Sequence, residues 1–239
     1  MTENLSAEAV FRDIEENYRQ ILQNMEAASA QAGIKRETVR FMAVTKTVPP
    51  LFVNHALQLG IDLIGENKVQ ELLEKKPLLN GNFQSHLIGH LQTNKVKKII
   101  REVSMIQSVD SLHLAREISK QAQTAELTMP ILLELNIGEE ESKSGFMPDG
   151  FDEIALQIAQ LPNLSVDGVM AVPPICETEK EIRQWFSLVR KRYEDLKKHP
   201  ALQNMHTLSM GMSSDYTEAI LEGANLVRVG SALFGHRRY

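Results

Sequence analysis

A lysine stands just after a short apolar run in the first fifth of the chain. The stretch "FMAVTKTVPP", residues 41–50, begins with four residues typical of a buried β-strand, and Lys46 follows two positions after them. A lysine at a strand end is ordinarily a solvated surface charge. An amine that is desolvated and close to another cation, however, has a lowered pKa and can attack a carbonyl carbon. Lys46 is therefore a candidate nucleophile, with a solvated charge as the alternative.

Two late stretches combine glycine and serine in a way that suits anion binding. "LSMGMSSD" contains Ser213 and Ser214, and "VRVGSALFG" contains Gly230 and Ser231. Backbone N–H groups of such loops can converge on a phosphate at the start of a helix. The two serines are also expected to cap a helix that begins at Asp215. Ordinary caps and turns are the alternative interpretation.

Arg228 lies two residues before Gly230, so the alternation of a strand directs its side chain into the same interior. A buried guanidinium requires a partner. That partner is an interior carboxylate such as Glu134 or Glu66, or alternatively the ring nitrogen of a pyridine. A phosphate site that faces an amine indicates a phosphorylated aldehyde as the ligand.

These residues must be positioned by strands that alternate with helices. Eight short apolar runs are each separated by a helical pattern, which indicates βαβ units and a parallel sheet. Eight such units in a chain of 239 residues favour a closed (β/α)8 TIM barrel. In this α/β fold the carboxyl ends of the strands carry the active site, and the loops after the last two strands bind phosphate.

A long amphipathic helix precedes the first strand. Apolar residues recur at three- and four-residue steps over residues 6–32, with Ser6 as the expected N-cap and Gly33 as the C-terminal stop. Few residues follow the eighth strand, so we expect residues 1–33 to pack on the barrel where the last outer helix is missing. The sequence thus predicts one barrel domain over residues 1–239 with an additional N-terminal helix.

Composition excludes several classes of protein. The net charge of −5 gives no general attraction to nucleic acid, and no apolar run approaches the about 18 residues of a membrane span. Cys176 is the single cysteine, so no intrachain disulfide forms, and the histidines lack metal-ligand spacing. No secretory signal is visible. We therefore expect a cytoplasmic protein without metal, membrane or nucleic-acid partners.

Eight ordered motifs resemble one known family. They are "AVTKTVP", "IGENKVQEL", "HLIGHLQTNK", "SVDS", "LELNIGEEESKSGF", "GVMAVPP", "LSMGMSSDYTEAI" and "VRVGSALFG". Together they resemble the pyridoxal phosphate homeostasis proteins, which are relatives of the barrel domain of alanine racemase. The resemblance runs from about residue 10 to the last residue. It implies that Lys46 forms a Schiff base with pyridoxal 5'-phosphate in the barrel mouth.

The resemblance also assigns the other site residues. Ser213, Ser214 and the backbone of Gly230 and Ser231 are expected to hold the phosphate, and Arg228 is expected to face the pyridine nitrogen. Asn67 is expected near the 3-hydroxyl group of the ring, while Met210 and Met170 are expected to line the pocket. The roles of His90, Lys143 and the tail residues Arg237 and Arg238 stay open.

The resemblance implies intracellular vitamin B6 and amino-acid homeostasis rather than robust catalysis. A guanidinium beside the pyridine nitrogen weakens the ring as an electron sink, and the second acid/base that racemisation needs is not evident. We expect a monomeric carrier or buffer whose partners are the cofactor and pyridoxal-phosphate-dependent apoenzymes. A slow amino-acid racemase or lyase is one alternative. A barrel that binds another phosphorylated metabolite, with Lys46 unreacted, is another.

Overall fold

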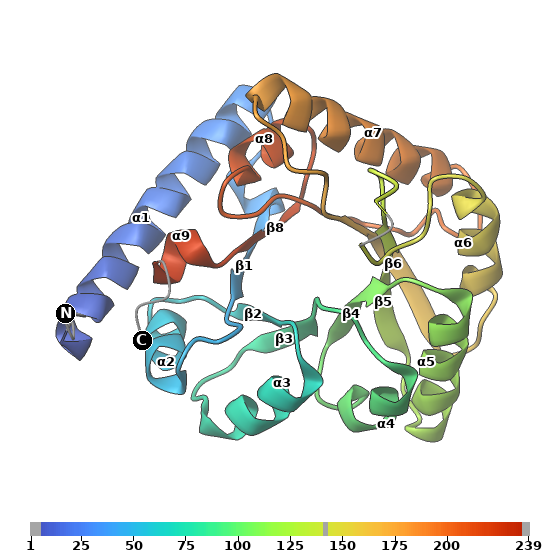
Figure 1. Cartoon of the computed structure of the whole chain (residues 1–239), viewed down its shortest axis with the longest axis horizontal. Helices are drawn as coiled ribbons and strands as arrows, with labels where there is room; N and C mark the ends of the chain where they lie inside the picture. Colours follow the sequence, from blue (N-terminus) through green and yellow to red (C-terminus); the bar gives the residue numbers. More distant parts are fainter. Residues whose placement is uncertain (1–5, 141–142, 236–239) are drawn as a thin grey trace.

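The computed structural model of this chain describes residues 6–140 and 143–235. Within those ranges, eight parallel strands form one closed barrel in chain order, and β8 pairs with β1 to close it (Figure 1). The strands are β1 Arg40–Val44, β2 Leu63–Glu66, β3 Gln84–Leu87, β4 Met105–Val109, β5 Met129–Leu135, β6 Leu164–Ala171, β7 Thr207–Ser209 and β8 Leu226–Val229. The predicted (β/α)8 barrel is confirmed.

Helices surround this barrel and cover the outer face of its sheet (Figure 1). They are α1 Ala7–Ala32, α2 Pro50–Gln58, α3 Val69–Lys75, α4 Val96–Ile99, α5 Leu112–Thr124, α6 Phe151–Ala159, α7 Glu179–Lys197, α8 Tyr216–Leu221 and α9 Ser231–Phe234, with the short 3-10 helices η1 Arg36–Thr38, η2 Lys76–Leu78 and η3 Thr93–Lys95. In the described part of the chain, none of these helices has the length and apolar character needed to cross a membrane.

The first helix, α1, begins and ends at residues that the sequence indicates. The Ser6 side chain accepts a hydrogen bond from the Ala9 N–H, and Gly33 adopts a left-handed conformation with φ of 69°. The helix packs against α8, α2 and the four-residue α9 that comes after β8 (Figure 1). Asn17 Nδ2 ties α1 to α9 by donating to the Leu233 carbonyl at 3.0 Å. Helix α1 thus packs on the outer side of the barrel, where β8 leads into α9.

The core has two parts because strand residues alternate between the two faces of the sheet. Most buried apolar residues lie in one cluster between the sheet and the helices. Two smaller clusters fill the barrel interior; they are centred on Met42, Leu63 and Leu226, and on Met105, Leu132 and Met170. These side chains make part of the barrel interior apolar.

Candidate functional site

A cavity of about 810 Å³ opens where the barrel strands end. Its lining comes from the ends of β1, β2, β3, β5, β6, β7 and β8 and from the loops that follow them, which is where this fold places its sites. The lining residues are Val44, Lys46, Thr47, Val48, Asn67, Ile88, Glu134, Met170, Val172, Met212, Ser213, Ser214, Arg228, Gly230, Ser231, Phe234 and Gly235. The structure therefore brings together all the site residues expected from the sequence except Met210.

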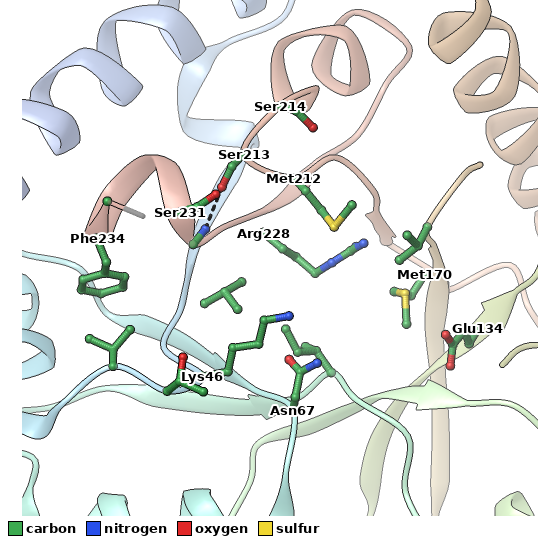
Figure 2. A pocket seen from close by; sticks show the side chains of 17 residues that line it. Lys46, Asn67, Glu134, Met170, Met212, Ser213, Ser214, Arg228, Ser231 and Phe234 are labelled. Atoms are coloured by element: carbon green, nitrogen blue, oxygen red, sulfur yellow. Dashed lines mark hydrogen bonds between the residues drawn. The ribbon is translucent and has the colours of Figure 1, made fainter. Parts of the chain in front are cut away.

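The Lys46 side chain points into this cavity (Figure 2). It follows β1 by two residues, and Val44, the last residue of that strand, lines the cavity beside it. Its ammonium group makes no hydrogen bond or ion pair with any residue in the described ranges. A primary amine that is held by a strand end and has no partner of its own is available for reaction with a ligand.

The Ser213 hydroxyl lies at the glycine- and serine-rich end of the cavity. Its Oγ accepts a hydrogen bond from the Gly230 N–H at 3.1 Å (Figure 2). The same oxygen also accepts one from the Ala232 N–H at 3.1 Å. The expectation that Ser213 caps the helix at Asp215 is therefore wrong, because this hydroxyl reaches the start of α9 instead. Asp215 itself is the N-cap residue of α8, and its carboxylate accepts from the Met212 N–H at 2.6 Å.

Two glycines allow the chain to pass close to its neighbours around this end. Gly211 has φ of +90°, and a Cβ there would lie 2.5 Å from the Ala219 Cβ, so only glycine fits without rearrangement. A Cβ at Gly230 would lie 3.3 Å from the Val44 carbonyl oxygen. Gly211 therefore lets its loop pass close to α8, and Gly230 lets the chain after β8 pass close to the end of β1. The hydroxyl and backbone groups of residues 213, 214, 230 and 231 line one end of the cavity.

Arg228 is buried inside the barrel, where a chain of hydrogen bonds fixes its orientation. The guanidinium donates to Ser209 Oγ at 2.7 Å and to the Ala171 carbonyl at 2.9 Å. Ser209 then donates to Gln107 Oε1 at 2.8 Å, and Gln107 Nε2 lies 2.8 Å from His86 Nδ1. Burial lowers the pKa of Arg228 to about 10 and that of His86 to about 3.

The ion pair considered for Arg228 does not form with either candidate in the described structure. Glu66 lies on the other face of the sheet, where Lys75 Nζ approaches its Oε1 to 2.6 Å. Glu134 lines the cavity and attracts Arg228 electrostatically, but it makes no ion pair within 4 Å. Arg228 therefore presents a fixed positive charge to the cavity, without a carboxylate bound to it (Figure 2).

Glu134 is the titratable lining residue that sequence reasoning did not assign to the site. Burial raises the pKa of its carboxyl to about 7, helped by the nearby Asp110 and opposed by Arg228 and His90. Its side chain makes no hydrogen bond with the described residues. The sequence carries one signal for this residue: Glu134 is acidic and lies near the end of the apolar run "MPILLELN". Because side chains alternate between the two faces of a strand, Glu134 shares a face with buried apolar residues.

Asn67 and the methionines are the remaining residues that the sequence placed in the site. Asn67 Oδ1 is buried and has no hydrogen-bond partner among the described residues, so it can accept one from a ligand. Met170 lines the cavity as expected. The expectation for Met210 is wrong: Ser209 faces the interior, so Met210 points outward into the helix-covered core, and Met212 reaches the cavity instead.

Of the residues whose roles were left open, His90 and Lys143 lie outside the cavity lining. His90 Nδ1 is 2.9 Å from Asp110 Oδ2, and its ring is largely exposed. Lys143 Nζ donates to Glu140 Oε1 at 2.6 Å and to the Pro173 carbonyl at 3.2 Å. The tail residues 237 and 238 lie outside the described ranges.

The fold and the cavity define a barrel of the alanine racemase type, in which a free lysine at the end of β1 faces a serine- and glycine-rich loop pair. Residues 16–238 match the family described as alanine racemase, N-terminal domain. An alanine racemase of Clostridium difficile shares this fold at 16% identity with a TM-score of 0.70, over 93% of this chain and 57% of that one.

Relatives of higher sequence identity define the family of this chain more narrowly. The pyridoxal phosphate homeostasis protein of Aquifex aeolicus is 37% identical over 94% of this chain and 98% of its own length, and the one from Escherichia coli is 33% identical over 95% and 98%. The chain belongs to the pyridoxal phosphate homeostasis protein family. PipY of Synechococcus elongatus, a structure with bound PLP, matches at 31% identity with a TM-score of 0.78, covering 89% of this chain and all of that one.

Proposed function

We propose that this protein binds pyridoxal 5'-phosphate through a Schiff base to Lys46 and serves as a carrier or buffer of the cofactor. The observation that carries the proposal is the Lys46 amine, which has no partner among the described residues and lies in a cavity whose other end carries serine hydroxyls and loop backbone. When bound, this cofactor would supply an aldehyde, and the Lys46 amine would condense with the aldehyde carbon with loss of one water molecule. Relatives named for pyridoxal phosphate homeostasis, and PipY with PLP bound, support this choice of ligand.

The lining residues fit the other groups of this cofactor. The orphaned Oδ1 of Asn67 suits the ring hydroxyl, which can donate a hydrogen bond to it. Ser213, Ser214, Gly230 and Ser231 offer hydroxyl and backbone groups for the phosphate, and Arg228 offers a fixed cation to the pyridine nitrogen. The Gly230 N–H already donates to Ser213 Oγ, whereas the Ser213 O–H has no acceptor among the described residues and can donate to an incoming phosphate.

A carrier fits the electrostatics better than a catalyst of carbanion chemistry. A guanidinium at the pyridine nitrogen disfavours protonation of that nitrogen, which weakens the ring as an electron sink. The described lining residues include no tyrosine and no histidine, the usual side chains for a second acid/base. We further propose a cytoplasmic monomer that supports amino-acid homeostasis by delivering the cofactor to apoenzymes.

A slow pyridoxal-phosphate-dependent racemase or lyase is the second candidate function, and Glu134 is the observation that favours it. A carboxyl whose pKa lies at about 7 can exchange a proton near neutral pH, as a general acid or base must. Glu134 lines the same cavity as Lys46. It is therefore the residue on which any residual proton transfer at an amino acid would depend.

Loading the protein with pyridoxal 5'-phosphate separates the carrier from the enzyme. We expect the loaded wild-type protein to restore activity to a pyridoxal-phosphate-dependent apoenzyme. Over the same period, nuclear magnetic resonance in deuterated water should show no more loss of the α-proton of alanine than free cofactor causes. Fast exchange that disappears in Glu134→Gln would instead establish the second candidate.

A further inference from the structure

A buried polar cluster lies behind Lys46, between the barrel and α3. Lys75, at the end of α3, is only 7% exposed, which is unusual because lysine side chains are seldom buried without a partner. Its ammonium donates to Glu66 Oε1 at 2.6 Å, to Glu71 Oε1 at 2.8 Å and to the carbonyl oxygen of Thr45 at 2.6 Å. An ammonium group has three N–H donors, so these contacts use all of them.

The two carboxylates of this cluster also hold the residues on either side of Lys46. Thr45 Oγ1 donates to Glu66 Oε1 at 2.7 Å. The backbone N–H of Thr47 donates to Glu71 Oε1, the same oxygen that Lys75 contacts. Both chain neighbours of Lys46 are thus tied to one ammonium group, either directly or through a carboxylate.

The backbone next to Lys46 needs such support. Thr47 has φ of 62°, a left-handed conformation that is unfavourable for a β-branched residue and persists only where the surroundings fix it. The Thr45 carbonyl also accepts a hydrogen bond from the Val48 N–H at 3.0 Å, which closes the turn around Lys46. The turn that orients Lys46 therefore contains a strained residue, Thr47, and the Lys75 ammonium group holds this turn through its contacts.

A contribution to the folding stability of the protein does not by itself explain why this cluster is present. Buried ion pairs are often no more stabilising than apolar residues of the same size. Here burial raises the pKa of Glu66, and its Oε2 is buried without a hydrogen-bond partner among the described residues. We propose that Lys75, with Glu66 and Glu71, is a positioning cluster that holds Lys46 in the orientation needed to react with a bound aldehyde. This inference rests on the proposed function.

Lys75→Met removes the ammonium but keeps an unbranched side chain, and Lys76→Met is the matched control. Lys76 is the next residue and pairs with Glu102 at 3.0 Å, away from Lys46. We expect Lys75→Met to slow trapping of pyridoxal 5'-phosphate on Lys46 by about tenfold to a hundredfold, because small displacements of a reacting group cost rates of that order. Affinity for pyridoxine 5'-phosphate, which has no aldehyde, should stay within about twofold of wild type in both variants.

Amide hydrogen exchange at Thr47 provides a readout that needs no cofactor. It should become about tenfold faster in Lys75→Met and stay unchanged in Lys76→Met, since the cluster restrains this amide through Glu71. Glu71→Ala, at a more exposed position, should have the same effect on exchange and serves if Lys75→Met does not fold.

Unchanged exchange and unchanged trapping in the folded variants would overturn the inference. A wild-type protein that traps no cofactor on Lys46 would overturn the proposed function instead, and Thr47 exchange would still decide whether the cluster restrains this turn.

Discussion

Lys46→Ala is expected to abolish covalent capture of pyridoxal 5'-phosphate while leaving the barrel folded. Lys46 has no hydrogen bond or ion pair in the described structure, so its removal breaks no contact that supports the fold. Loss of the covalent bond should weaken cofactor binding by at least about a hundredfold, equivalent to about 2.7 kcal/mol. Absorption of the bound cofactor in the visible range, followed during titration, measures both the bond and the affinity.

Lys68→Ala is the matched control for this experiment. Lys68 is an exposed lysine beside Asn67 and does not line the cavity. We expect it to bind the cofactor as the wild-type protein does, with the same visible absorption. An unaltered absorption band in Lys46→Ala would show that another amine holds the cofactor, or that the band does not report a bond to lysine.

Glu134→Gln is expected to stabilise the protein more at pH 8 than at pH 5. Burial raises the pKa of the Glu134 carboxyl from its ordinary value of 4.5 to about 7, so the folded chain retains a proton that the unfolded chain releases. The stability contributed by the protonated carboxyl is fully present below about pH 4.5 and is lost as the pH rises through about 7. Glutamine has the shape of the protonated acid but does not titrate.

Urea unfolding at the two pH values measures this difference. The free energy of unfolding of Glu134→Gln, relative to wild type, should increase by on the order of 2 kcal/mol between pH 5 and pH 8. Glu153→Gln, on the exposed face of α6, is the control and should show no such change. An equal difference between variant and wild type at both pH values would mean that Glu134 ionises normally in the folded protein.

Much of the fold could be predicted from the sequence because its signals are local. The apolar runs that alternate with helical patterns correspond to the eight strands of the barrel. Ser6 and Gly33 mark the ends of α1 because a hydroxyl cap and a left-handed glycine act on the nearest backbone groups. Closure of the sheet followed from the number of units.

The finer details of the site depend on contacts between segments far apart in the chain. Whether Met210 or Met212 reaches the cavity is decided by the strand alternation at Ser209 and by the turn at Gly211, which single residues do not reveal. Ser213 could be recognised as a hydroxyl donor or cap, but its bond to the Gly230 N–H joins two loops. Lys75 belongs to the stretch "ELLEKK", which looks like an ordinary solvated helix end until α3 is packed against the barrel.

Reduction of the cofactor-loaded wild-type protein with borohydride, followed by peptide mass spectrometry, tests the central claim most directly. Borohydride converts a Schiff base into a stable secondary amine, which marks the lysine that formed it. We predict a single major pyridoxyl adduct, located on the peptide that contains Lys46. A major adduct on any other lysine, or none at all, would contradict the assignment of Lys46 as the residue that holds pyridoxal 5'-phosphate.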